Sequence, residues 1–268
     1  MSPSPSSRSD RPVSPKDAFV TVYGRKPVLE ALGDPALEVD KVVLAEGADR
    51  DAVRTFTEAA RARGLVLQRA SAQRVKVLAG NGRQDQGVLA DVVAPRMRPI
   101  EHFLADLPDH ADARVLVLDG LTNPANVGMI LRSATGAGLE GVLLPRRGAP
   151  AIDPLVIKAS AGVAFHAPVL RARSAADGLA ALAEAGFVLL GLDGPGAAGP
   201  GTAPPSLFEA ELPGRVALVV GGETDGITDD VRGELHGTVT IPLAPGVESL
   251  NAAVAASVAC FELARRRG

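Results

Sequence analysis

Residues 114–138 read RVLVLDGLTNPANVGMILRSATGAG, and the two halves of this stretch have different characters. The first part, RVLVLD, is a run of apolar branched residues, which is typical of a strand buried in a parallel sheet. Asn123 and Pro124 follow as a turn into a helix, with Asn123 as the N-cap and Pro124 in the first helical position. The helix is predicted to run from Pro124 to Gly136. A strand, a turn and a helix in this order form the repeating unit of a parallel α/β fold.

The same alternation continues to the end of the chain. The apolar runs GVLLP, FVLLGLDG, VALVVGG and GTVTIPL read as strands, and helices are expected near Leu155, near Asp229 and over the closing apolar segment. This pattern favours a parallel sheet with helices on both faces, and by itself predicts an open doubly wound sheet. We therefore place one α/β domain over residues 112–268.

A second, smaller α/β domain is predicted over residues 18–94. It contains the strand-like runs FVTVYG, DKVVLAE, LVLQRA and VLADVV and three helices, one capped by Ser71 and one ended by Gly64. Residues 95–111 carry three prolines and are predicted to be a linker with one helical turn. Residues 1–17 are rich in Ser, Pro and Arg and are predicted to be a disordered tail rather than a secretory signal.

Composition excludes several classes of protein. Aromatic residues make up 3% of the chain, so stacking of bases on an aromatic platform is not expected to be the main binding device. The single cysteine, Cys260, excludes an internal disulfide framework, fits the reducing cytoplasm, and is expected to be a packing residue. No run reaches the roughly 20 apolar residues that a membrane-spanning helix needs.

The charge is unevenly distributed along the chain. The net formal charge is −3, but residues 1–98 carry +4 and residues 99–268 carry −7. The first part is thus the better candidate for contact with a polyanion, although chance asymmetry explains the split equally well.

One motif is a false lead. Residues 194–199 match the dinucleotide-binding pattern GxGxxG and follow a strand. Such a site requires the glycine turn to open a helix, whereas three prolines follow within residues 200–205. A dinucleotide-dependent dehydrogenase would depend on these glycines alone.

Three further motifs carry polar residues at the predicted ends of strands. These are Asn126 and Arg132 in the helix after RVLVLD, Gly221 and Glu223 in LVVGGETDGI, and Ser249 with Asn251 in TIPLAPGVESLN, which we place in the first turn of the closing helix. Ligands bind beyond the carboxyl ends of strands in such sheets. Each motif alone also has a simple structural explanation: Asn123 or Asn251 caps a helix, Arg132 reaches solvent, and Glu223 lies in an ordinary turn.

Taken in order, the three motifs resemble the SpoU (TrmH) family of the SPOUT superfamily. These proteins are S-adenosylmethionine-dependent RNA 2′-O-ribose methyltransferases. The resemblance covers residues 112–268, and the segments VYGRKPVLEAL, KVVLAEG and GNGRQDQGVLADV resemble the family's L30e-like RNA-binding domain. It implies a deep trefoil knot in the C-terminal domain and a homodimer whose sites draw on both protomers, with the closing helix at the interface.

The resemblance also implies roles for individual residues. Asn126, Arg132, Glu223, Ser249 and Asn251 match catalytic positions, and Gly221, Ile241 and Leu250 match positions whose backbones contact S-adenosylmethionine. Gly222 and Thr224 depart from the residues common there, Ser or Ala and Gly. The reaction needs no metal. Because guanidinium stays protonated, we expect Arg132 to hold a phosphate and stabilise the emerging alkoxide rather than act as a base.

The resemblance indicates RNA as the substrate, with 23S ribosomal RNA favoured over transfer RNA. Arg25, Lys26 and Arg83 lie in glycine-bearing turns of the small domain and are the predicted RNA contacts, although each one taken alone is better explained as a solvated surface charge. A catalytically inactive L30e-like RNA-binding protein is the alternative from another functional class.

Overall fold

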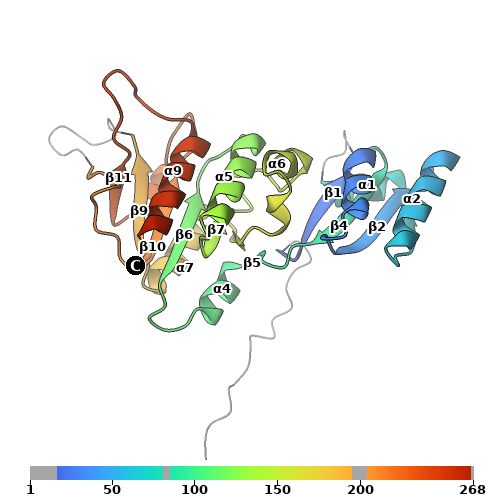
Figure 1. The fold of residues 1–268 in the computed structure, drawn as a ribbon, viewed down its shortest axis with the longest axis horizontal. Helices are drawn as coiled ribbons and strands as arrows, with labels where there is room; N and C mark the ends of the chain where they lie inside the picture. Colours follow the sequence, from blue (N-terminus) through green and yellow to red (C-terminus); the bar gives the residue numbers. More distant parts are fainter. Residues whose placement is uncertain (1–16, 81–84, 195–203, 267–268) are drawn as a thin grey trace, which may run out of the picture.

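The computed structural model describes residues 17–80, 85–194 and 204–266 (Figure 1). The chain forms two α/β units that lie side by side, one around a four-stranded sheet and the other around a seven-stranded sheet. The α/β fold class predicted from the alternation of apolar runs and helices is therefore confirmed.

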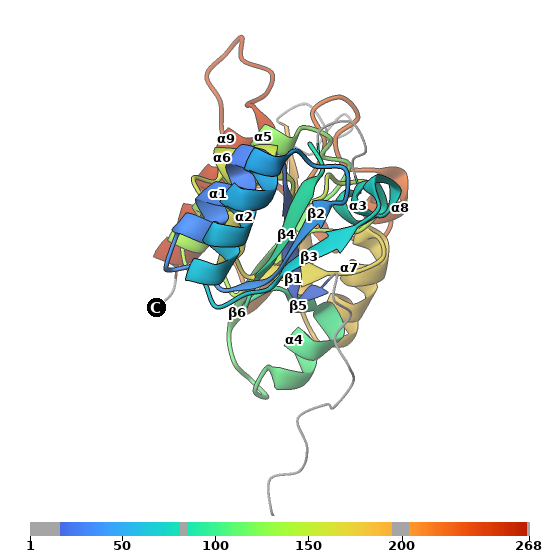
Figure 2. The ribbon, with the colours of Figure 1, turned by 90° about the vertical axis from the view of Figure 1, so that its right-hand side faces the viewer.

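The smaller unit has the strand order β1-β4-β2-β3, in which β4 runs antiparallel to both of its neighbours. Helices α1 and α2 cover one face of this sheet and α3 covers the other (Figure 2). Ser71 caps α3 as predicted, since its hydroxyl accepts a hydrogen bond from the Arg74 amide at 3.2 Å. The elements are β1 (Phe19–Tyr23), α1 (Arg25–Gly33), β2 (Val39–Ala45), α2 (Arg50–Ala62), β3 (Leu67–Ala70), α3 (Ala72–Ala79) and β4 (Val88–Val93).

The larger unit has the strand order β11-β9-β10-β6-β7-β8-β5, and all its paired strands run parallel. The carboxyl ends of these strands therefore share one edge of the sheet. The elements are β5 (Arg98–Pro99), α4 (Ile100–Asp106), β6 (Ala113–Leu118), α5 (Pro124–Gly136), β7 (Gly141–Leu143), α6 (Pro154–Ala159), a 3-10 turn (Val163–Phe165), β8 (Val169–Arg171), α7 (Ala175–Glu184), β9 (Val188–Asp193), β10 (Arg215–Val220), α8 (Asp229–Arg232), β11 (Gly237–Thr240) and α9 (Ala252–Arg265).

Helices cover both faces of the larger sheet, as expected. Helices α5, α6 and α9 bury one face in an apolar cluster, and α4, α7 and α8 bury the other. Helix α5 has the predicted bounds because Asn123 caps it and Pro124 opens it. The sequence analysis assigned no element to β8 or α7.

The segment predicted to be a linker carries structure of its own. Strand β5 pairs with β8 at the edge of the larger sheet, and Ile100 and Phe103 of α4 are buried against that sheet. The chain thus enters the larger unit at Arg98, before the predicted start of the second domain.

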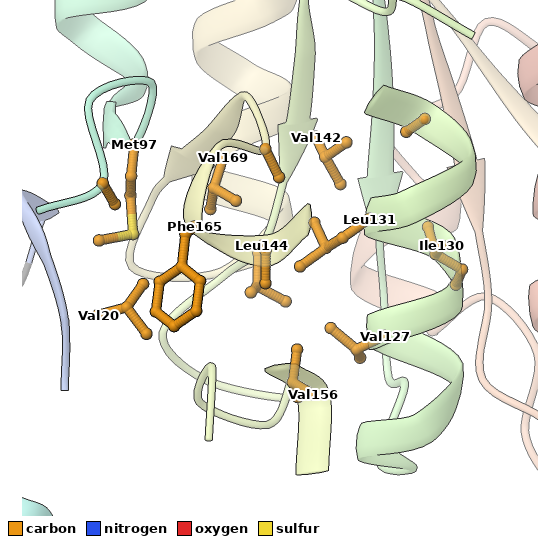
Figure 3. Close-up of a cluster of buried hydrophobic side chains, with 14 of the residues drawn as sticks. Val20, Met97, Val127, Ile130, Leu131, Val142, Leu144, Val156, Phe165 and Val169 are labelled. Carbon is orange, nitrogen blue, oxygen red and sulfur yellow. The ribbon is translucent and has the colours of Figure 1, made fainter. Parts of the chain in front are cut away.

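The two units also share a core. Figure 3 shows the Phe165 ring between Val20 of β1 and Leu144 of the larger unit, with Met97 beside it. Val20, Met97 and Phe165 are 2%, 7% and 5% exposed. Burying a side chain of this size stabilises by about 1.5–3 kcal/mol, so the junction is a packed interface rather than an open hinge.

The closing helix α9 lies against α5 (Figure 1), and the hydroxyls of Ser133 and Ser257 are 2.7 Å apart between them. One face of α9 is fully buried. The opposite face exposes Val254 by 50% and Phe261 by 56%, which is unusual for large apolar side chains on one helix.

Candidate active site

A cavity of about 420 Å³ opens at the carboxyl ends of β9, β10 and β11. Its size is that of a small-molecule site, and its position is where open α/β sheets bind ligands. Three segments form its walls, with the residues Leu192, Asp193, Gly194, Val220, Gly221, Gly222, Glu223, Gly226, Ile227, Ile241, Leu243, Ser249, Leu250, Asn251, Ala252 and Ala255.

A glycine turn after β10 shapes one wall. The amides and carbonyls of Gly222 and Gly226 exchange hydrogen bonds of 2.9 and 3.1 Å, which folds the loop back on itself. A Cβ on Gly221 would lie 2.2 Å from the carbonyl carbon of Gly226, and one on Gly222 would lie 2.4 Å from the carbonyl oxygen of Gly120. Close backbone packing therefore explains why Gly222 stands where a larger residue is common.

Two carboxylates that follow strands hold this wall, and the sequence analysis assigned neither of them to the site. Asp119, after β6, accepts a hydrogen bond from the Thr228 amide at 2.7 Å. Asp193, at the end of β9, lines the cavity and forms a two-pronged ion pair with Arg232 of α8 at 2.7 and 3.0 Å. This hydrogen-bonded pairing raises the pKa of the Arg232 guanidinium. In both cases the sequence feature that could have identified the residue is an aspartate at the carboxyl end of an apolar strand.

Asn126, Glu223 and Asn251 meet in one hydrogen-bonded network. The Asn251 amide group donates to Oδ1 of Asn126 and to Oε1 of Glu223, both at 3.3 Å. The side-chain amide of the buried Asn126 also donates to Oε1 of Glu223. Residues from three separate motifs thus converge on a single carboxylate oxygen, which fixes the orientation of both amides.

Asn251 also caps the closing helix. Its Oδ1 accepts hydrogen bonds from the amides of Ala253 at 2.9 Å and Val254 at 3.3 Å. Asn251 therefore takes part in both the helix cap and the network. Its Oδ1 caps the helix, and its amide nitrogen donates to Asn126 and Glu223.

The structure brings the other predicted cofactor-binding residues to the same cavity. Gly221, Ile241 and Leu250 all line it, as does Ser249. The prediction for Ser249 needs one correction: α9 begins at Ala252, so Ser249 lies in the loop before the helix and not in its first turn. The loop that contains Pro242 and Pro245 continues through Ser249, and the helix begins only after its N-cap, Asn251.

Arg132 lies apart from this cavity. It is exposed on α5, nearly two turns beyond Asn126, and it is not among the residues that line the cavity. Residues six apart on a helix point in different directions, so Arg132 and Asn126 do not share a face of α5.

The structure describes two of the three predicted RNA contacts of the smaller unit, and both form ion pairs. Arg25 forms an ion pair with Asp49 at 2.7 Å, and Lys26 lies 3.7 Å from Glu30. Arg83 lies outside the described residues, as do residues 195–199 of the GxGxxG stretch. The paired state of Arg25 and Lys26 reduces the charge that they offer to a ligand.

Neither a reactive cysteine nor a metal site is found among the described residues. Cys260 is buried, and burial raises the pKa of its thiol to about 12, so it is a packing residue as predicted. Within residues 17–80, 85–194 and 204–266, no three His, Cys, Asp or Glu side chains are grouped closely enough to hold a metal ion.

In the same ranges, no helix combines the length and apolar content required to cross a bilayer.

Comparison with known proteins supports the resemblance to the SpoU family independently of the structure. The SpoU rRNA Methylase family matches residues 113–261, and the RNA 2′-O ribose methyltransferase substrate binding family matches residues 21–98. A relative from Xylella fastidiosa named 23S rRNA (guanosine-2′-O-)-methyltransferase RlmB is 36% identical over 92% of this chain and 96% of its own length. A Mycobacterium tuberculosis relative named an uncharacterized tRNA/rRNA methyltransferase is 35% identical over 96% of this chain and 77% of its own.

Solved structures agree with the fold. A putative RNA methyltransferase of the TrmH family from Porphyromonas gingivalis superposes with a TM-score of 0.58 at 28% identity, covering 94% of this chain and 91% of that one. The SpoU methyltransferase AviRb from Streptomyces viridochromogenes, solved with the cofactor AdoMet, gives 0.59 at 25% identity over 93% and 91%. The resemblance seen in the three motifs is thereby confirmed, and the chain belongs to the SpoU methyltransferase family.

Proposed function

We propose that this protein transfers a methyl group from S-adenosylmethionine to a ribose 2′-hydroxyl of RNA, with 23S ribosomal RNA as the substrate. The observation that carries the proposal is the convergence of Asn126, Glu223 and Asn251 at the rim of the glycine-walled cavity. The names of the relatives support both the reaction and the ribosomal substrate.

The cavity fits the cofactor. Its floor has the apolar side chains of Ile241 and Leu243, and its glycine turn leaves backbone groups open to a ligand that approaches closely. Gly221, Ile241 and Leu250 are the residues that hold the cofactor, as the family resemblance implies, and all three line the cavity. The AviRb structure with AdoMet supports S-adenosylmethionine as that cofactor. When bound, S-adenosylmethionine supplies an electrophilic methyl group.

The residues of the chain then position the nucleophile. Asn126 and Asn251, fixed by Glu223, orient the ribose together with Ser249. Arg132 holds a substrate phosphate and stabilises the alkoxide that develops as the 2′-hydroxyl gives up its proton to solvent water. No metal is needed for this displacement.

The Arg132 that holds the phosphate at each cavity comes from a second protomer. In one chain it lies outside the cavity, whereas α9 and α5 expose the large apolar residues Val254, Phe261 and Met129. We therefore propose a homodimer in which α9 lies at the interface and each site draws on both chains. Covering those apolar side chains provides a driving force for association.

The finer features of the fold belong to the same proposal. The resemblance implies a deep trefoil knot, which the shared lining of one cavity by residues 221–227 and 241–251 supports. We propose an L30e-like RNA-binding domain over residues 18–94 and a SPOUT domain over 112–268 in a cytoplasmic protein. They are joined by residues 95–111, whose β5 and α4 pack at the edge of the larger sheet. The tail predicted over residues 1–17 does not include Asp17, which is buried and pairs with Arg146, and residues 1–16 lie outside the described residues.

The direct test is to incubate the purified protein with tritiated S-adenosylmethionine and unmodified ribosomal RNA, and then to map the label. Label on a ribose 2′-oxygen of the large-subunit RNA is the expected result and names the nucleotide. Label on transfer RNA alone would keep the chemistry and overturn the substrate. RNA binding without any label would favour an inactive L30e-like RNA-binding protein.

A further inference from the structure

Four arginines gather at the carboxyl ends of β7 and β8, on the same edge of the sheet as the cavity. Beyond these strands the chain segments stay paired, because the amides of Arg146 and Arg147 donate to the carbonyls of Ala172 and Arg173 at 3.0 and 3.1 Å. We call Arg146, Arg147, Arg171 and Arg173 the seam arginines, since they border the junction of the two units.

Arg171 is the least exposed of the seam arginines. Its Nη1 donates to the carbonyl of Leu144 at 2.8 Å, while its Nε is buried and has no acceptor among the described residues. Burial, together with repulsion from Arg146, lowers the pKa of the Arg171 guanidinium to about 10, so it remains charged at neutral pH. A buried cation beside a second cation is costly unless an anion joins them.

The chain supplies little negative charge to offset this cluster. Asp17 pairs with Arg146. Asp153 lies close by, but its carboxylate caps α6 by accepting hydrogen bonds from the amides of Leu155 and Val156, both at 2.9 Å. Arg147 and Arg173 are exposed, and neither forms an ion pair within the part of the chain that the structure describes.

A cavity of about 400 Å³ lies at the same place. Arg171 and Asp153 of the larger unit line it together with Thr21, Val77 and Gly80 of the smaller unit. Both units thus form its walls, and the packed junction around Phe165 holds them in place.

We propose that the seam arginines bind the phosphodiester backbone of the RNA substrate as it passes from the smaller unit to the catalytic cavity. Arg147 and Arg173 provide the exposed contacts, and Arg171 provides fixed positive charge behind them. Guanidinium suits this task because it binds phosphate through two hydrogen bonds and keeps its charge.

The location favours RNA over a small free anion. Two neighbouring segments present the charge as a strip, and a strip of cations matches a repeating phosphate backbone. The strip lies on the sheet edge that also carries the catalytic cavity, since β7 and β8 follow β10 and β6 in the strand order. This inference rests on the proposed function, because it takes RNA as the substrate.

The test compares wild-type protein with Arg147→Gln/Arg173→Gln, in which both exposed cations are neutralised and Arg171 is left in place. Binding to a 23S ribosomal RNA transcript is measured as a function of salt, and methyl transfer is measured as a function of RNA concentration. We expect the slope of log affinity against log salt to become shallower by about 1.5, since each phosphate that the variant no longer neutralises reduces the slope by roughly 0.7–0.9.

The same variant should raise the KM for RNA about tenfold while kcat at saturating RNA and the Kd for S-adenosylmethionine stay within about twofold. The matched control is Arg147→Lys/Arg173→Lys, which keeps the charge and should keep the salt slope. Thermal melting checks that both variants remain folded.

The outcomes separate this inference from the proposed function. If wild-type protein binds and methylates RNA, and the glutamine variant has an unchanged salt slope and KM, only the role of the seam arginines is overturned. A wild-type protein that neither binds nor methylates any RNA would overturn the proposed function and this inference together.

Discussion

The two halves of one sheet edge have opposite chemistry. Beyond β6, β9, β10 and β11 the chain supplies glycines, amides and carboxylates, and each of Asp119, Asp193 and Glu223 has a hydrogen-bonding partner. Beyond β7 and β8 it supplies the seam arginines, of which one is partly buried and two are exposed without ion pairs among the described residues. A parallel sheet collects every strand end at one edge, so the residues that follow each strand decide what each part of that edge can bind.

The difference suits two ligands of opposite charge. S-adenosylmethionine carries a positive sulfonium, and a wall with carboxylates and neutral backbone groups accommodates it. RNA carries one negative charge per nucleotide, and arginines accommodate that. Substitutions on the two halves should therefore separate cofactor binding from RNA binding. Changes at Gly221 and Glu223 test the half that carries the cavity, Arg147→Gln/Arg173→Gln tests the other half, and changes at Arg132 and Glu262 lie outside both.

The largest effect on cofactor binding is expected for Gly221→Ala. The added methyl would meet the backbone of Gly226 at 2.2 Å, so the turn must open and the cofactor wall must move. We expect affinity for S-adenosylmethionine, measured by calorimetry, to fall more than about 100-fold, at a cost of roughly 3 kcal/mol. RNA binding should persist; a change in cofactor affinity below threefold would show that this turn does not shape the cavity.

Arg132→Ala should lower the rate of methyl transfer by about 10³-fold, because it removes a positive charge from the developing alkoxide. The Kd for S-adenosylmethionine should change by less than about twofold. Single-turnover methylation and equilibrium binding measure the two quantities. A loss of cofactor affinity as large as the loss of rate would refute the proposed role.

Glu223 tests the network that links the three motifs. In Glu223→Ala the amides of Asn126 and Asn251 lose their shared acceptor, which costs roughly 1–3 kcal/mol and lowers kcat about 10- to 100-fold. Glu223→Gln keeps an acceptor oxygen and should retain most of the rate. Equal losses in the two variants would mean that the negative charge, and not the acceptor, is what matters.

The smallest effect on activity is expected for Glu262→Gln, far from both halves of the edge. Arg265 and Arg266 bind the buried Glu262 carboxylate and lower its pKa to about 2. The native pKa lies below the unfolded one, so the stabilisation is full above about pH 4.5 and is lost as pH falls towards 2. We expect the variant to lose about 2 kcal/mol of unfolding free energy at pH 7, and this deficit to shrink in acid.

Denaturant unfolding of both proteins at pH 7 and pH 3 measures this difference. Methyl transfer under folded conditions serves as the control and should be unchanged. A deficit that stays constant between the two pH values would show that the ion pairs of Glu262 do not stabilise the fold.

Local patterns in the sequence were enough for much of the fold. The bounds of α5 were predictable because Asn123 and Pro124 start the helix and Gly138, with a φ of 72°, follows its end, all within one segment. Strand β8 was missed because three residues give too short a pattern, and β5 was missed because it has only two residues, one of them Pro99, in a proline-rich segment that reads as a linker. Both strands are defined by their hydrogen bonds to each other, which no local pattern reports.

The sequence by itself determined the α/β alternation, the order of the three motifs and hence the family of the chain. It also determined that Gly221, Glu223 and Asn251 follow strands or precede a helix, because each of these signals lies within about ten residues. Such signals act through backbone conformation, and the chain carries them wherever it folds.

Only the tertiary structure decided which of these residues meet. Asn126 and Glu223 are 97 residues apart in sequence, yet they share a hydrogen bond because β6 and β10 are neighbours in the sheet. The same packing leaves Arg132 outside the cavity of its own protomer and brings the seam arginines together at the junction of the units. Strand order sets these distances, and strand order is fixed by the burial of both faces of the sheet rather than by any single segment.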